Sequence, residues 1–174
     1  ISSISANNGR KLVRDSTGRL HVVYFRFATV WNIYHSYSDD SGQTWTEEAI
    51  TSDVSYNQWA PSIAIDSSNH LHVVWYGRSA SSTTFNQIRY SKHEGSWSAP
   101  VDLTGEVYEQ TLPSIAIDSG DHIHVVWEGQ SSLSPSYTQV RYSQYESSWS
   151  APTNLTSGSL WVWGPSVAID SSNN

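Results

Sequence analysis

The sequence of 174 residues has no cysteine and no methionine, and basic residues are scarce. Without cysteine, neither a disulfide framework nor a zinc–thiolate site can form. Nine Lys and Arg residues stand against 16 Asp and Glu residues, which gives a net charge of −7. Because nucleic-acid surfaces need clustered basic side chains, this balance argues against a nucleic-acid partner. No apolar run approaches about 20 residues, so no membrane span is predicted.

Aromatic residues, in contrast, are abundant. The chain has 9 Trp and 10 Tyr residues, and aromatic residues make up 13% of it. This content is too high for a disordered segment. No stretch keeps a helical period, whereas β-branched and aromatic residues alternate between Gly, Asn, Ser and Pro turns, which is typical of strands.

An internal repeat organises the chain. Pro61, Pro113 and Pro165 are 52 residues apart, and so are Trp45, Trp97 and Trp149. Residues 61–104 and 113–156 are identical at 27 of 44 positions. A repeat of this length predicts stacked copies of one structural unit.

Each unit is predicted to hold four short strands. In the second unit these are Ser62–Asp66, His70–Tyr76, Phe85–Ser91 and Trp97–Thr104, with a polar loop over Gly77–Thr84. Four strands in 40 to 50 residues are typical of a β-propeller blade. The predicted fold class is therefore all-β, a propeller of four-stranded antiparallel blades.

The blades are predicted at about 10–52, 61–104 and 113–156, and the first strand of a fourth at about 163–170. A closed propeller needs about four to eight blades. Three explanations stay open. The chain is a fragment of a longer propeller, it is the ordered part of one, or copies of it associate into a closed ring, as in a six-bladed homodimer.

The first unit is more diverged than the others. Its landmarks align Tyr37 with Tyr90, and Arg14 with Ala64 and Ala116. Under this alignment Arg14 lies on the strand that lines the central channel, which makes it a candidate ligand-binding residue.

One turn of the first unit carries a recognisable motif. Residues 38–45 read Ser-Asp-Asp-Ser-Gly-Gln-Thr-Trp, and the motif positions are Ser38, Asp40, Gly42, Thr44 and Trp45. The pattern resembles the Asp box, or BNR repeat, of sialidase-like propellers. The resemblance implies a structural turn on the rim, with Trp45 in the seam between blades, and it implies fold more than activity.

No catalytic set is predicted. The Arg-Ile-Pro motif of sialidases is absent, and no two carboxylates can be placed together among the candidates Asp53, Glu106, Glu109 and Glu128. Glycosidases need such a pair. A fragment of a sialidase-like glycoside hydrolase is kept as an alternative function. No cofactor is predicted.

Two recurring residue types are interpreted as scaffold. His21, His72 and His124 repeat at one strand position, which favours packed inter-blade histidines over a metal site. An aspartate ends the first strand of every unit, which predicts a turn role. These residues are Asp15, Asp66, Asp118 and Asp170.

Ligand-binding residues are predicted in the loops that join successive units, 52–60, 105–112 and 157–164. These loops differ from one another and combine aromatic rings with acids and amides, which suits sugar faces. Trp59 and Trp163 are predicted to wedge between blades. The predicted ligand-binding residues are Tyr56, Tyr108, Trp161, Glu109 and Arg14.

The favoured function is a secreted, non-catalytic propeller module that binds carbohydrate or protein or serves as a structural or adhesive unit. A recently amplified or engineered repeat without a specific ligand is a further alternative.

Overall fold

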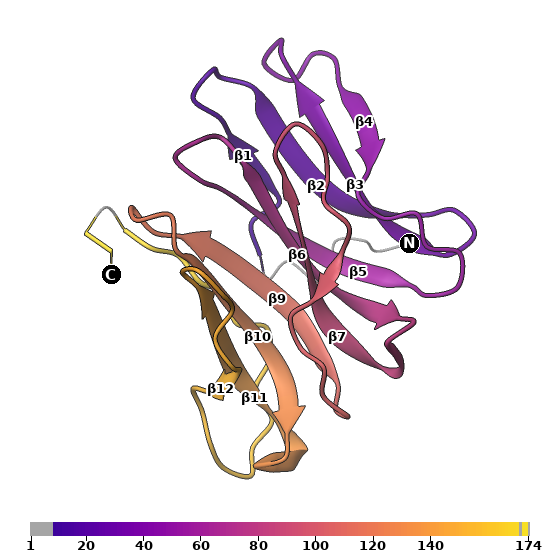
Figure 1. The fold of residues 1–174 in the computed structure, drawn as a ribbon, viewed down its shortest axis with the longest axis vertical. Helices are drawn as coiled ribbons and strands as arrows, with labels where there is room; N and C mark the ends of the chain where they lie inside the picture. The colour runs from indigo at the N-terminus through magenta and orange to yellow at the C-terminus, as the bar shows by residue number, and fades with distance from the viewer. Residues whose placement is uncertain (1–8, 171, 174) are drawn as a thin grey trace.

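The computed structural model describes residues 9–170, 172 and 173, and Figure 1 shows them as three four-stranded antiparallel sheets. Sheet 1 comprises β1 (Leu12–Arg14), β2 (Leu20–Phe27), β3 (Trp31–Ser38) and β4 (Thr46–Ala49). Sheet 2 comprises β5 (Gln58–Ile65), β6 (Leu71–Ser79), β7 (Ser82–His93) and β8 (Val101–Asp102). Sheet 3 comprises β9 (Gln110–Ile117), β10 (Ile123–Ser131), β11 (Ser134–Tyr145) and β12 (Thr153–Asn154). These described residues form no helix, and so none that could cross a membrane.

Sheet 2 lies between the other two, and each of its faces is buried against a neighbour (Figure 1). One hydrophobic cluster fills the seam between sheets 1 and 2 and contains the fully buried Trp75. A second fills the seam between sheets 2 and 3 and contains Trp127, also fully buried. Burial on both faces explains why β6 and β10 read as nearly continuous apolar runs instead of alternating.

The predicted loop over Gly77–Thr84 is wrong. Strand β6 continues to Ser79 and β7 begins at Ser82, and these two residues pair, so the turn has only two residues. Of the polar residues in the predicted loop, Arg78, Thr83 and Thr84 are exposed strand residues, whereas Ser79 is buried. The fourth strand is shorter than the predicted Trp97–Thr104. β8 pairs over two residues, and Trp97 makes only an isolated bridge.

The predicted alignment of Tyr37 with Tyr90 is also wrong. His21 Nδ1 is 3.0 Å from His35 Nε2, just as His72 Nδ1 is 2.8 Å from the Tyr90 hydroxyl. His35 therefore occupies the position of Tyr90. The hairpin that follows is longer in sheet 1, and this extra length misaligned the two sequences.

Arg14 likewise aligns differently from the prediction. It pairs with Leu20, as Ile65 pairs with Leu71 and Ile117 with Ile123, so it replaces an isoleucine and not the preceding alanine. One step along a strand reverses the side of the sheet to which a side chain points.

The turn at residues 38–45 makes the hydrogen bonds that its sequence predicts. Asp40 accepts from the Thr44 amide at 2.8 Å and the Thr44 hydroxyl at 2.6 Å, and Ser38 donates to it at 2.8 Å. These bonds lower the pKa of Asp40 to about 2. Gly42 has φ of 92°, a conformation that favours glycine.

Trp45 is 43% exposed, and its indole nitrogen donates to the Gly42 carbonyl. Trp97, in contrast, packs against the hydrophobic cluster between its own sheet and the preceding one. No described sheet precedes sheet 1, so the seam position of Trp45 stays a prediction.

Residues 163–170, predicted as a strand, have no strand assignment. A strand needs a hydrogen-bonded neighbour, and the described residues supply none here. The segment nevertheless repeats a seam contact: Ser114 Oγ accepts from the Val167 amide at 3.2 Å, as Ser62 Oγ accepts from the Ile115 amide at 3.4 Å.

The aspartate turns confirm their predicted role and also link the sheets. Asp66 Oδ1 accepts from the amides of Ser68 and His70. The next sheet then reaches back, because Asp121 Oδ1 accepts from the Ser67 amide at 2.8 Å. The same link joins Asn69 to Ser16 and Asn173 to Ser119. All three linking residues have positive φ, between 61° and 64°.

Candidate functional site

Each sheet has two different ends. At one end, which we call the turn end, lie the aspartate turns and the turn at residues 38–45. At the other, the loop end, β5 starts beside the finish of β6, and the linking loops meet the short β6–β7 and β10–β11 hairpins. Tyr56, Tyr108, Glu109 and Trp161 belong to this loop end, whereas Arg14 lies at the turn end and its Nε donates to the Gly18 carbonyl. The structure therefore separates Arg14 from the other predicted ligand-binding residues.

A small hollow opens at the loop end of sheet 2. Its volume is about 220 Å³. One wall comes from the linking loop and the start of β5, and the other from the β6–β7 hairpin. The lining residues are Ser55, Tyr56, Asn57, Trp59, Arg78 and Asn86. Of the predicted ligand-binding residues, only Tyr56 lines this hollow.

The linking loop is held in shape by its own side chains. Asp53 Oδ1 accepts from the amides of Ser55 and Tyr56, both at 3.0 Å. Asn57 Oδ1 accepts from the Trp31 amide of sheet 1 at 3.0 Å. Asp53, considered as a catalytic carboxylate, is thus engaged in a turn, and it presents Tyr56 to the hollow.

Gln58 is a buried polar centre beneath the hollow. Its Oε1 accepts from Trp75 Nε1 at 2.8 Å and from Arg89 NH1 at 3.1 Å, and its Nε2 donates to the Arg78 carbonyl at 2.9 Å. Gly77 makes room for it, because a Cβ there would lie 2.3 Å from Gln58 Oε1. The sequence analysis missed this residue.

Gln110 makes the corresponding bonds to Trp127 and Arg141 in sheet 3. Gln58 and Gln110 lie 52 residues apart, so the repeat itself contained the pattern that would have revealed them.

The Trp59 ring closes one side of the hollow and also packs across the seam. Its centroid is 5.5 Å from Phe25 and 5.2 Å from Trp31, both in sheet 1. The predicted wedge is confirmed for Trp59. For Trp163 it stays a prediction, because no described sheet follows sheet 3; the ring is 71% exposed and stacks on Trp161 at 5.9 Å.

Arg78 supplies the charge of the hollow. Its side chain is exposed and makes no ion pair with any described residue. Arg89 and Arg141, which are predicted to be scaffold, differ from Arg78 because each has a carboxylate partner. Arg89 pairs with Asp102 at 2.8 Å, and Arg141 pairs with Glu106 at 2.7 Å. Arg19 and Arg26 also pair with carboxylates.

Glu109 stands beside the hollow without lining it. Its Oε2 accepts from Asn86 Nδ2 at 2.9 Å and from the Asn86 amide at 3.3 Å, so it orients the amide that forms part of the wall. Tyr108 contributes its carbonyl to Gln110 Nε2 at 3.4 Å. Glu128, another carboxylate considered for catalysis, is buried and accepts from the Thr111 hydroxyl at 2.9 Å.

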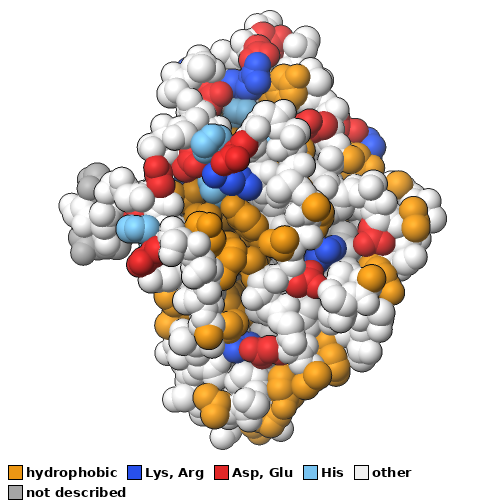
Figure 2. Space-filling model, viewed as in Figure 1, with side chains coloured by type: hydrophobic (Ala, Val, Ile, Leu, Met, Phe, Trp, Pro, Cys, Tyr) orange, Lys and Arg blue, Asp and Glu red, His pale blue; other side chains and the backbone are white. Residues whose placement is uncertain are grey.

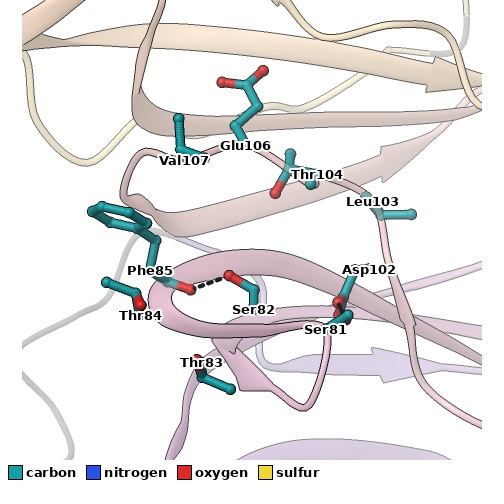
Figure 3. Close-up of a pocket in the computed structure, with 11 residues that line it drawn as sticks. Ser81, Ser82, Thr83, Thr84, Phe85, Asp102, Leu103, Thr104, Glu106 and Val107 are labelled. Carbon is teal, nitrogen blue, oxygen red and sulfur yellow. Dashed lines mark hydrogen bonds between the residues drawn. The ribbon is translucent and has the colours of Figure 1, made fainter.

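A larger hollow, of about 470 Å³, lies between the β6–β7 hairpin and residues 102–107 (Figure 3). Its charged groups and two of its serines have partners. Ser82 donates to the Phe85 carbonyl, and Asp102 accepts from Ser81 and from Arg89. Glu106 points away from the hairpin and pairs with Arg141. This hollow therefore presents small hydroxyl groups and no free charge.

The remaining charge is dispersed. Each basic side chain visible in Figure 2 lies beside an acidic one, so this face has no basic patch. Among the described residues, no three His, Asp or Glu side chains are grouped to hold a metal ion. The repeated histidines bond within their own sheets: His72 contacts Asp66 at 3.2 Å and Tyr90 at 2.8 Å. His21 and His72 are buried, so these two are packed and hydrogen-bonded as predicted.

Comparison with known proteins yields the fold. No family model matches the chain, and no curated protein matches it. Among solved structures, an ulvan lyase of polysaccharide lyase family PL25 has a TM-score of 0.65 at 12% identity and covers 87% of this chain and 44% of its own. An α-L-arabinanase of Penicillium chrysogenum has a TM-score of 0.59 at 13% identity, covering 90% and 47%. A fucose lectin of Kordia zhangzhouensis has a TM-score of 0.52 at 15% identity, covering 80% and 94%.

The chain spans less than half the length of the two enzymes, and every identity is low. The likeness therefore shows the fold alone. These neighbours are propeller-like proteins that bind or act on carbohydrates, and the three sheets of the present chain follow their arrangement without closing on themselves.

Proposed function

We propose that this chain is a non-catalytic, carbohydrate-binding β-propeller module whose site is the hollow at the loop end of sheet 2. The observation that carries the proposal is the composition of that hollow, in which Trp59 and Tyr56 stand beside Arg78 and Asn86. Sugar rings stack their C–H faces on aromatic rings while their hydroxyls bond to convergent polar groups.

The candidate carboxylates support a binding role over catalysis. Asp53 holds a turn, Glu106 pairs with Arg141, and Glu128 bonds to Thr111. A glycosidase needs two carboxyl groups free to act on a sugar from opposite sides. The alternative of a sialidase-like hydrolase receives no support from this arrangement.

Within this proposal the three sheets are blades, and the turn at residues 38–45 is an Asp box on the rim. The exposed Trp163 and the seam contact of Val167 with Ser114 support a further blade beyond sheet 3. That blade comes from more chain or from a second copy. We place the module outside the cell, where polysaccharides are accessible.

Solution mass distinguishes the two ways of closing the ring. A self-assembled ring predicts a dimer by multi-angle light scattering, whereas a longer propeller predicts that this chain alone has the monomer mass of 19.4 kDa. A monomer at micromolar concentration contradicts self-assembly.

The proposed function predicts that the chain binds members of a glycan panel and that Tyr56→Ala weakens this binding at least tenfold, because it removes one aromatic wall. Tyr137→Ala is the matched control, since Tyr137 lies against Trp161 and outside the hollow. Calorimetric titration measures both. Turnover of a glycoside, or binding that survives Tyr56→Ala and is lost in Tyr137→Ala, would contradict the proposal.

A further inference from the structure

The hollow of sheet 2 carries a charge that the corresponding place in sheet 3 does not. Strand register aligns Arg78 with Gln130, Trp59 with Thr111 and Asn86 with Thr138. Positions that maintain the scaffold repeat between the two sheets, as Arg89 and Arg141 do. Arg78 does not repeat, so the fold does not require it.

The Arg78 guanidinium also has no carboxylate partner. Four other arginines are neutralised by carboxylates, whereas Arg10, Arg14 and Arg78 have no ion pair among residues 9–170. Of these three, only Arg78 lines the hollow. The chain is acidic overall, with a net charge of −7, so most of its surface disfavours an anion.

The size of the hollow limits what it can hold. Its volume of about 220 Å³ is below the roughly 300–1,000 Å³ of sites for drug-sized ligands. One sugar ring is therefore the natural unit, with the rest of a chain extending into solvent. Trp59 and Tyr56 offer ring faces, and the Asn86 amide, oriented by Glu109, offers hydrogen bonds to hydroxyls.

We infer that this hollow recognises a carboxylate-bearing sugar residue, such as a uronic acid, through Arg78. The planar guanidinium matches a carboxylate with two parallel hydrogen bonds. The inference rests on the proposed function, since it names the class of sugar that the same site takes.

The test uses a matched pair of ligands, an oligoglucuronate and the same oligosaccharide with its carboxylates reduced to alcohols. The expected result is at least tenfold tighter binding of the oligoglucuronate. Arg78→Gln places in sheet 2 the residue that sheet 3 already carries. This substitution should remove the preference for the oligoglucuronate and leave the affinity for the neutral oligosaccharide unchanged. Arg19→Gln, which removes an equal charge at the turn end, should keep the preference.

Other outcomes overturn the inference in distinguishable ways. Equal binding of the two oligosaccharides, with both weakened by Tyr56→Ala, removes the carboxylate claim and leaves carbohydrate binding at the site intact. A third ligand is the carboxyl-reduced oligosaccharide after sulfation, which carries sulfate groups and no carboxylate. If it binds as tightly as the oligoglucuronate, any anion suffices. Binding of neither oligosaccharide, together with no binding across the glycan panel, removes the proposed function itself.

Discussion

Replacing Gln58 with alanine is expected to lower the free energy of unfolding by about 3 kcal/mol, because two buried donors lose their acceptor. These donors are Trp75 Nε1–H and the Arg89 guanidinium, and Gln58 is fully buried between them. Arg89 keeps Asp102, so its charge stays paired. The measurement is chemical denaturation followed by tryptophan fluorescence.

The control for this substitution is Gln43→Ala. Gln43 is exposed and makes one hydrogen bond, to the Asp40 carbonyl at 3.2 Å, so its loss should cost less than about 0.5 kcal/mol. If both variants lose the same small amount, the buried network around Gln58 is not what holds the seam together.

Acid is expected to destabilise the protein before its carboxylates titrate, and His35 is the main cause. Burial lowers the pKa of His35 from its ordinary 6.5 to about 4. The unfolded chain therefore takes up a proton that the folded chain resists. The stability that His35 contributes is complete above pH 6.5 and declines as the pH falls toward 4, by up to about 3 kcal/mol.

His35→Tyr tests this expectation with a side chain that the fold already accepts. Tyr90 and Tyr142 occupy the same position, and Tyr90 lies against Trp149 as His35 lies against Trp97. The unfolding free energy of this variant should fall less steeply between pH 6.5 and 4.5 than that of the parent chain. Parallel profiles would show that His35 does not set the acid response.

Much of the fold could be predicted from the sequence, because the repeat exposes it. The prolines and tryptophans at constant spacing define units of four strands, and the aspartates at the strand ends define turns. The alignment errors arose in sheet 1, whose longer hairpin shifts its sequence against the other units, so that His35 and not Tyr37 occupies the place of Tyr90.

The site was less predictable for a different reason. Tyr56 was predicted from its aromatic loop, but Arg78 lies in a segment that was predicted to be a polar loop, and Asn86 lies in a predicted strand that was not considered for binding. Their approach to Tyr56 depends on strand register, which pairs Gln58 with Gly77 and Gly77 with Gln87. Arg78 and Asn86 are about 20 to 30 positions from Tyr56 in the sequence, so the sequence alone does not reveal that they lie together. Arg14 shows the opposite error. It was predicted to bind ligand because its strand was misaligned by one residue, and it lies at the turn end, away from the hollow.

Carbohydrate binding at the loop end of sheet 2 is tested most directly by following individual side-chain N–H signals in nuclear magnetic resonance spectra during titration with an oligosaccharide identified by the glycan panel. The account predicts that the signals of the Trp59 indole, the Arg78 guanidinium and the Asn86 amide shift together and saturate at one dissociation constant. Shifts confined to Trp161 and Trp163, with these three signals unmoved, would contradict it.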